Sequence, residues 1–468
     1  MSRKHDEAAQ EAKHAQASAP PTETRGSGRR AGFRSARPSR RRVAARRPAQ
    51  AHIPRALLPA LHAIGLSVVD VAHYWSEERR ALRRGLTVVL LTSVTGMIAG
   101  ITLASAEATL QRLPGLLLLV PAAIGMRGNI YGALASRLAT ALHIGAFEFE
   151  LRRHSFLGRQ VEATSLLTLS TSVIIAVVAW ILGSALGLHP IPLWQLIVIV
   201  TVGGVAASLI LLVVTVVLAA ISQRRDWNMD DVGAPTVTMF GDVLTIPALL
   251  LAALLVPFEH FTLVLGILLA GLGVWSLFAG WRHADDTVRR IVRESVATLA
   301  VASVIGVLAG TVLQARVAQW IAAPVLLIML PSFVASCGTL GGILSSRLSS
   351  KLYLGLLEPK PVPGRIAGLD MSVTFLYGIF AFTAIGITAW IAAWVLGYDS
   401  PGLPSVAGIT ILAGILSMLL LSGVAYTTAA TAYRHGLDPD NQGIPIVTSV
   451  MDFLGLLCLL GVASIWIN

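Results

Sequence analysis

Long apolar stretches dominate this sequence, and from Gly85 onward eleven of them are long enough to cross a membrane as helices. A helix needs about 20 predominantly apolar residues to span about 30 Å of hydrocarbon. The alternating polarity of outer-membrane barrel strands is absent. We therefore predict an all-α polytopic membrane protein with about eleven transmembrane helices, at 86–106, 113–145, 165–188, 192–221, 235–257, 261–281, 296–316, 322–355, 372–397, 404–432 and 444–466.

Two of these stretches, 113–145 and 322–355, exceed the length of one straight crossing. Both carry Gly and Pro near their middles. Because proline removes a backbone hydrogen bond and glycine weakens a helix, we expect bends or unwinding in both.

The net charge of the chain comes entirely from its first 84 residues. The formal net charge is +11, and residues 1–84 hold 18 Lys/Arg against 7 Asp/Glu, whereas the rest holds 18 of each. Residues 1–52 lack the apolar periodicity of a packed core and predict a disordered basic tail. Residues 53–84 have apolar residues at helical spacing and predict an interfacial amphipathic helix. A basic tail on a neutral apolar body predicts contact with anionic lipid head groups, and no nucleic-acid partner.

The connecting segments predict the orientation. With the tail in the cytoplasm, segments on that side hold twelve Lys/Arg and those on the other side only two. This ratio agrees with the positive-inside rule. We therefore expect a multi-pass protein of the cell membrane with a cytoplasmic N-terminus and an extracytoplasmic C-terminus.

The second half of the sequence repeats the first at an offset of 210 residues. The segment 121–138 realigns on 331–348 and the segment 230–242 on 440–452, both without gaps. The predicted helices obey the same offset. We predict two parallel five-helix repeats, 85–257 and 296–468, joined by a linker helix and a cytoplasmic loop at 258–295. Parallel repeats are related by a pseudo-twofold axis along the membrane normal, so a site on that axis would use equivalent residues of both halves.

Two repeat-equivalent carboxylates, Asp242 and Asp452, interrupt apolar helices. An Asp inside a membrane helix costs about 2.5 to 3.5 kcal/mol on insertion scales, so its default interpretation is functional. Each follows a proline by seven residues, which puts it about 10 Å into the membrane. The alternative, a cap or an ion pair, is disfavoured because neither helix contains Lys, Arg or His.

Two unpaired carboxylates suit a hard cation such as Mg²⁺, which takes oxygen ligands and retains waters. The alternative is that they carry protons. Other candidate cation ligands lie near these carboxylates in the sequence. Gly128 and Gly338 would let backbone carbonyl oxygens approach the axis between the halves, and Asn129, Thr238, Thr339 and Thr448 would supply neutral side-chain oxygens. The alternative for the glycines is close helix packing. An acidic cluster at the cytoplasmic mouth contains Asp230, Asp438 and Asp440, for which helix capping is the alternative.

Two blocks of sequence resemble the magnesium transporters of the MgtE and solute carrier family 41 families. Val120–Asn129 (VPAAIGMRGN) followed by 134–145 (LASRLATALHIG) is similar to the first-repeat motif. The blocks at 230–242 and 440–452 share Asp-x-x-Gly-x-Pro-x-Val-Thr-x-x-x-Asp and resemble the fifth-helix motif. The resemblance implies Mg²⁺ transport through a pore between two fused five-helix units, with Asp242 and Asp452 as pore carboxylates. Thr339 departs from the Asn of the family pattern, which implies an asymmetric pore.

The sequence therefore favours a divalent-cation transporter in which Mg²⁺ is the transported substrate and no cofactor is needed. No phosphate-binding loop or nucleophile motif points to an enzyme. Two alternatives stay open: a proton- or sodium-coupled carrier of a small organic solute that uses the same carboxylates, and a membrane scaffold without transport. The sequence leaves metal selectivity, a gating role for 53–84 and a homodimer open.

Overall fold

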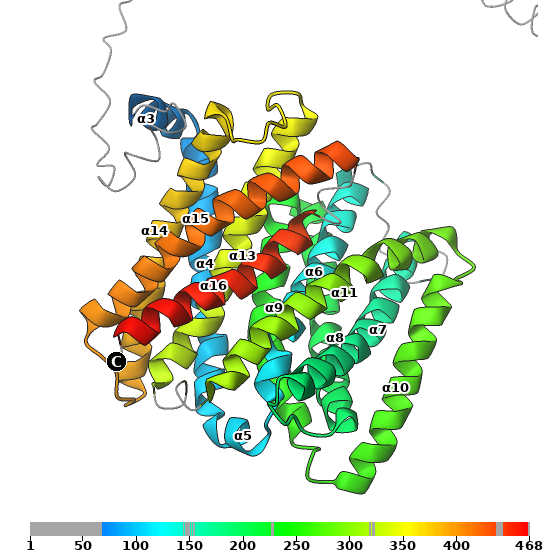
Figure 1. Ribbon diagram of the computed structural model, residues 1–468. Helices are drawn as coiled ribbons and strands as arrows, with labels where there is room; N and C mark the ends of the chain where they lie inside the picture. Colours follow the sequence, from blue (N-terminus) through cyan, green and yellow to red (C-terminus); the bar gives the residue numbers. More distant parts are fainter. Residues whose placement is uncertain are drawn as a thin grey trace, which may run out of the picture. The chain divides into compact units, whose positions relative to one another are not determined.

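The computed structural model describes residues 68–143, 155–225, 229–317, 323–436 and 443–466, with Gly145, Glu150, Arg152 and Trp320. The predicted tail 1–52 and the residues 53–67 lie outside this part. The described residues form helices joined by short connections: α3 Val68–Glu77, α4 Arg79–Ser105, α5 Glu107–Arg112, α6 Leu116–His143, α7 Phe156–Ala185, α8 Leu193–Arg225, α9 Met229–Ala253, α10 Glu259–Trp281, α11 Asp286–Ala315, α13 Pro324–Tyr353, α14 Arg365–Val395, α15 Leu403–His435 and α16 Ile444–Trp466 (Figure 1).

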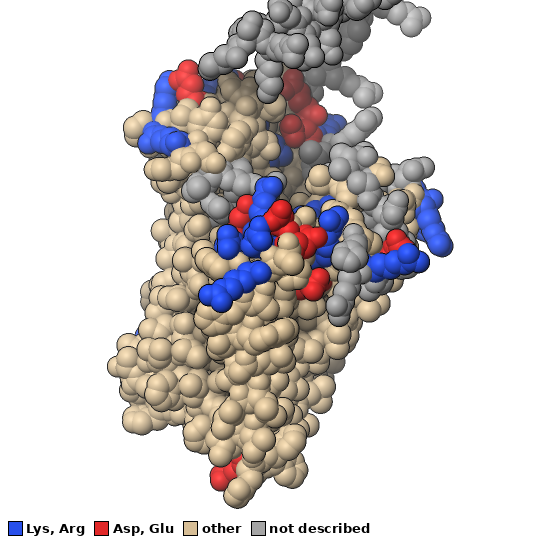
Figure 2. All heavy atoms as spheres, turned by 90° about the vertical axis from the view of Figure 1, so that its right-hand side faces the viewer, with Lys and Arg blue, Asp and Glu red and all other residues tan. Residues whose placement is uncertain are grey.

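Eleven helices of the described chain are long and apolar enough to cross a membrane, namely α4, α6 to α11 and α13 to α16. The predicted all-helical polytopic fold is therefore confirmed. Figure 2 shows one face of the molecule, where a broad surface without charged side chains lies below a band of Lys, Arg, Asp and Glu. An uncharged surface of this extent is what hydrocarbon requires, since charged side chains are costly inside a bilayer.

The unwinding expected in the second and eighth stretches does not occur. Both α6 and α13 are continuous helices, with Pro121 and Pro331 inside them. Each proline removes one backbone hydrogen bond. The helices continue through it because α6 packs against α9 and α11 and α13 packs against α4 and α16, and membrane helices tolerate proline where neighbouring helices support them.

The helices of the two halves follow the 210-residue offset closely. α8 and α15 differ by 210 at both ends, and α7 and α14 end 210 residues apart. The remaining membrane helix, α10, lies at the edge beside α7 and α8 (Figure 1). The parallel twofold relation between the halves stays a prediction, supported by the contacts described next.

The first helix of the first half, α4, packs mainly on the second half, against α13 and α14. Two glycines one turn apart allow the backbones to meet. A Cβ built at Gly100 would lie 1.8 Å from the Ile328 oxygen, and one at Gly96 would lie 2.6 Å from Ser332 Cα. The Ser332 hydroxyl donates to the Ser93 carbonyl oxygen at 2.9 Å. Small residues at this spacing permit close helix contact in membranes.

The first helix of the second half, α11, makes the reciprocal contact with α6 of the first half. A Cβ at Gly310 would lie 2.3 Å from the Leu118 oxygen, and one at Gly306 would lie 2.7 Å from Ala122 Cα. These four residues correspond, at the 210-residue offset, to those of the α4 contact. The two halves therefore exchange their first helices.

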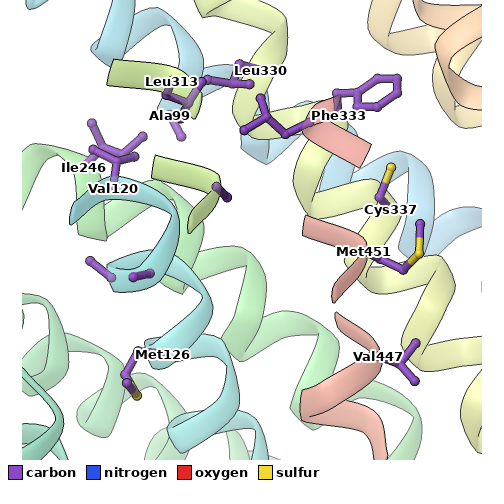
Figure 3. Packing of buried hydrophobic residues seen from close by; sticks show 14 of the residues in the cluster. Ala99, Val120, Met126, Ile246, Leu313, Leu330, Phe333, Cys337, Val447 and Met451 are labelled. Atoms are coloured by element: carbon purple, nitrogen blue, oxygen red, sulfur yellow. The ribbon is translucent and has the colours of Figure 1, made fainter. Parts of the chain in front are cut away.

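The buried core surrounds the central helices. Figure 3 shows Phe333 and Cys337 of α13 beside Val447 and Met451 of α16, and, apart from them, Val120 of α6 near Ile246 of α9. The pairs α13/α16 and α6/α9 are again equivalent at the 210-residue offset.

Candidate functional site

A cavity of about 950 Å³ lies between the two halves. Its lining comes from α4, α6, α7, α9, α11, α13, α14 and α16. Many repeat-equivalent pairs take part in it, among them Gly128/Gly338, Asn129/Thr339, Gly132/Gly342, Ser136/Ser346, Arg137/Arg347, Thr238/Thr448 and Asp242/Asp452. Residues that the sequence relates by an offset of 210 thus meet around one space.

The two carboxylates that the sequence singled out both line this cavity. Asp242 is 3% exposed, and its Oδ2 has no hydrogen-bond partner among the described residues. A buried carboxylate oxygen without a donor is unfavourable. A cation in the cavity would satisfy it.

Asp452 lies between glycines of the two halves. A Cβ built at Gly338 of α13 would lie 2.9 Å from Asp452 Oδ1, and one at Gly125 of α6 would lie 3.4 Å from Asp452 Oδ2. The carboxylate therefore occupies the space that a side chain at position 338 would take. The equivalent Gly128 faces Thr238 Cγ2 at 3.5 Å rather than Asp242. The two carboxylates thus have different surroundings despite their repeat equivalence.

The neutral oxygen candidates, Asn129, Thr339, Thr238 and Thr448, all line the cavity. The Thr448 hydroxyl donates to the Pro445 carbonyl oxygen at 3.0 Å, which leaves its lone pairs as acceptors. No group of three or more His, Cys, Asp or Glu side chains is close enough to hold a metal in the described part of the chain. A metal here would need neutral oxygens and waters besides the two carboxylates.

The predicted acidic mouth is outside what the structure describes. Asp438 and Asp440 lie outside the described residues, and of Asp230 only the backbone, in the first turn of α9, is described. Their proposed role at the mouth stays a prediction.

A charged network borders the cavity at the end where α3 lies, which we call the α3 end. Asp370 of α14 is fully buried and pairs with Arg347 at 2.9 Å and Lys351 at 2.7 Å, both of α13. The Tyr74 phenol of α3 donates to Asp370 Oδ1 at 2.8 Å and accepts hydrogen bonds from Arg347 and Lys351. Burial raises the pKa of Tyr74. The phenol therefore stays neutral and can donate to Asp370.

Further contacts of α3 are polar as well. Asp70 pairs with Arg365 at 2.5 Å, and the Trp75 indole donates to the Ser372 hydroxyl at 3.2 Å. Helix α3 is thus bound to α14 by side-chain bonds.

The first half carries the same arrangement with an amide in place of the carboxylate. There Arg137 donates to the Gln160 side-chain oxygen at 2.7 Å, and Gln160 corresponds to Asp370. Sequence reasoning missed Asp370 because the predicted helix begins at residue 372, whereas α14 begins at Arg365. Arg137 and Arg347 both line the cavity.

Comparison with known proteins bears on this site. A family model described as MgtE, divalent cation transporter, matches residues 120–252 and 330–462. The two matched segments are 210 residues apart and contain the cavity-lining pairs named above, including both carboxylates.

Curated relatives match most of the chain. Solute carrier family 41 member 2 of Xenopus laevis is 25% identical over 380 residues, which covers 74% of this chain and 64% of that protein. Member 2 of Homo sapiens is 26% identical over 375 residues, covering 74% and 63%. Member 3 of Rattus norvegicus is 22% identical over 394 residues, covering 78% and 83%. The chain thus spans slightly less than two thirds of the member 2 proteins. No solved structure matches it significantly.

Proposed function

This chain belongs to the MgtE family of divalent cation transporters, whose model matches more than half of it, and from this premise we propose that it carries divalent cations, Mg²⁺ foremost, through the cavity between its halves. The observation that supports the proposal most is the pair Asp242 and Asp452. They are equivalent carboxylates in one intramembrane cavity, and one of them has an oxygen without a donor.

The composition of the cavity suits Mg²⁺. This ion dehydrates reluctantly and binds through one or two carboxylates while it keeps several waters. Six waters occupy about 180 Å³ at roughly 30 Å³ each. The cavity of about 950 Å³ accommodates such a hydrated ion. In this proposal Asp242 and Asp452 hold the ion, and Asn129, Thr339, Thr238 and Thr448 bond to it or its waters.

The orientation completes the proposal. The α3 end faces the cytoplasm, because the connections at that end carry most of the Lys and Arg of the membrane unit. The basic tail then lies beside anionic lipid head groups of the inner leaflet. One chain supplies both sides of the cavity, so transport requires no second copy.

The test is uptake by proteoliposomes that contain a fluorescent Mg²⁺ indicator. We expect Asp242→Asn and Asp452→Asn, which keep the side-chain shape but remove the charge, each to reduce uptake more than about tenfold, as loss of a charged ligand costs well over 1.4 kcal/mol. Asp399→Asn is the matched control, because Asp399 is exposed and does not line the cavity. The same assay with Mn²⁺, Co²⁺ and Zn²⁺ measures selectivity.

Growth of a magnesium-auxotrophic strain gives a second readout. Wild-type uptake or rescue by both Asp→Asn variants, at normal abundance in the membrane, would contradict the assignment of the carboxylates. Transport of an organic solute that follows a proton or sodium gradient, without any response to divalent cations, would replace the proposal by the alternative carrier.

A further inference from the structure

A cationic side chain that the proposed mechanism does not use lies buried in α6. Arg127 is 2% exposed inside the membrane span Leu116–Leu142. Its Nη1 donates to the Ala123 oxygen at 2.5 Å and its Nη2 to the Val200 oxygen at 3.4 Å, whereas Nε has no hydrogen-bond partner. Within the described part of the chain no carboxylate pairs with it. Because a guanidinium stays protonated in proteins, Arg127 is a positive charge inside a membrane-spanning helix without a carboxylate beside it in the described chain.

The protein provides space for this guanidinium. A Cβ built at Gly204 of α8 would lie 2.2 Å from Arg127 Nη2 and 3.1 Å from the Ser172 hydroxyl oxygen of α7. Any side chain at position 204 would therefore displace the guanidinium. The guanidinium therefore fills a space between α6, α7 and α8 that the glycine leaves open.

In the second half, the equivalent space is filled by an apolar side chain. At the 210-residue offset, Cys337 replaces Arg127 and Phe382 replaces Ser172, while Gly414 retains the glycine. A Cβ at Gly414 would lie 2.2 Å from Phe382 Cδ2, and the Phe382 ring packs on Phe333 with centroids 4.6 Å apart. Figure 3 shows Phe333 and Cys337 on α13. The fold thus does not require a charge at this position, and only the first half has one.

Arg127 lies next to the residue that precedes Asp242 and two residues after the glycine of α6 that faces Asp452. Its Cβ is 4.0 Å from a Cβ built at Gly241, the residue before Asp242. Gly125, two residues earlier on α6, faces Asp452 Oδ2. The guanidinium itself contacts α8 and is not part of the cavity lining. The guanidinium can therefore affect a bound cation only by long-range electrostatic repulsion and not as a ligand.

We propose that Arg127 sets the affinity of the cation site, because its fixed positive charge opposes binding of a dication between Asp242 and Asp452 and so favours release. This inference rests on the proposed function. At about 10 Å, the spacing of packed helices, and at an effective dielectric constant of about 20, removal of one positive charge strengthens dication binding by roughly two hundredfold. The effect on a monovalent cation is about the square root of that factor, since the energy scales with charge.

The experiment compares variants that keep or remove the charge. Arg127→Met removes it at similar length, and Arg127→Lys keeps it. The double variant Arg127→Cys/Ser172→Phe removes it while reproducing the packing of the second half. Arg316→Met is the matched control, because Arg316 is exposed at the far end of α11 and lies outside the cavity lining.

The measurements are the concentration dependence of Mg²⁺ uptake by proteoliposomes and Mg²⁺ binding by calorimetry. We expect the two charge-removing variants to lower KM and the Kd about tenfold or more and to lower the maximal rate, because release slows. Arg127→Lys and Arg316→Met should keep KM within about threefold. A purely structural role would reduce the amount of folded protein and the maximal rate without lowering KM.

An unchanged or raised KM in folded Arg127→Met or in the double variant refutes the inference. If the wild-type chain transports Mg²⁺ and its KM does not respond to this charge, the inference alone fails. If the wild-type chain neither binds nor transports a divalent cation, the proposed function fails, and the inference fails with it.

Discussion

Replacement of Asp370 by Gln tests whether the charged network at the α3 end stabilises the protein. The substitution imitates the first half, where Gln160 occupies the equivalent position and accepts a hydrogen bond from Arg137. It keeps an acceptor for Arg347 but removes the charge that Arg347 and Lys351 share.

The expected cost follows from burial. Asp370 is fully buried, and removal of one partner of a buried ion pair costs about 3–5 kcal/mol. Arg347 and Lys351 are 21% and 22% exposed, and Glu78 lies 3.4 Å from Arg347. Water and Glu78 therefore stabilise part of the charge left behind. We expect Asp370→Gln to reduce the free energy of unfolding by about 2–3 kcal/mol.

A second substitution separates charge from packing. The residue equivalent to Lys351 is Ala141, so Asp370→Gln/Lys351→Ala reproduces the Arg, Gln and Ala that the first half has at these positions. Because the double variant leaves one fewer unpaired charge, we expect it to recover about half of the loss, a coupling of roughly 1 kcal/mol. Tryptophan fluorescence during thermal unfolding in detergent measures both variants, and Trp75 on α3 reports release of that helix. Wild-type Tm in Asp370→Gln, or strictly additive losses in the double variant, would refute this reasoning.

Three further predictions concern the cavity and the helix crossings. Gly338→Ala would place a Cβ 2.9 Å from Asp452 Oδ1, so Mg²⁺ uptake should fall about tenfold or more, whereas Gly461→Ala, with nothing within 4 Å, should leave uptake unchanged. Gly100→Ala would place a Cβ 1.8 Å from the Ile328 oxygen, so the yield of folded protein and its Tm should drop, and a normal yield would contradict the close α4–α13 contact. Mg²⁺ at about 100 times its Kd should stabilise the wild type by about 2.7 kcal/mol, seen as a higher Tm, and Asp452→Asn should lose this shift.

The membrane spans were predictable because hydropathy reports the property that membrane insertion selects. The helix ends were less predictable. The seventh span was expected at 296–316, whereas α11 begins at Asp286, ten residues earlier. The first turns of α11 carry Arg289, Arg290 and Arg293. Hydropathy does not distinguish a charged helical extension in water from a loop.

The residues around the cavity were predictable where the two halves agree. Equivalent positions such as Asp242 and Asp452 were expected to meet, and both line one cavity. Arg127 and Asp370 were missed because they occupy positions where the halves differ, with Cys337 and Gln160 as counterparts. Both residues can be found by aligning the two halves and looking for positions at which only one half has a charged side chain.

The exchange of first helices has a consequence for biogenesis. Ser93 of α4 and its partner Ser332 of α13 are 239 residues apart in the chain. At about 5–20 residues per second, synthesis of that interval takes roughly 10–50 s. During this time the glycine-lined face of α4 is in the membrane without the helix that covers it in the finished protein. Insertion of α13, rather than completion of the first five spans, is thus the event that commits α4 to its final position.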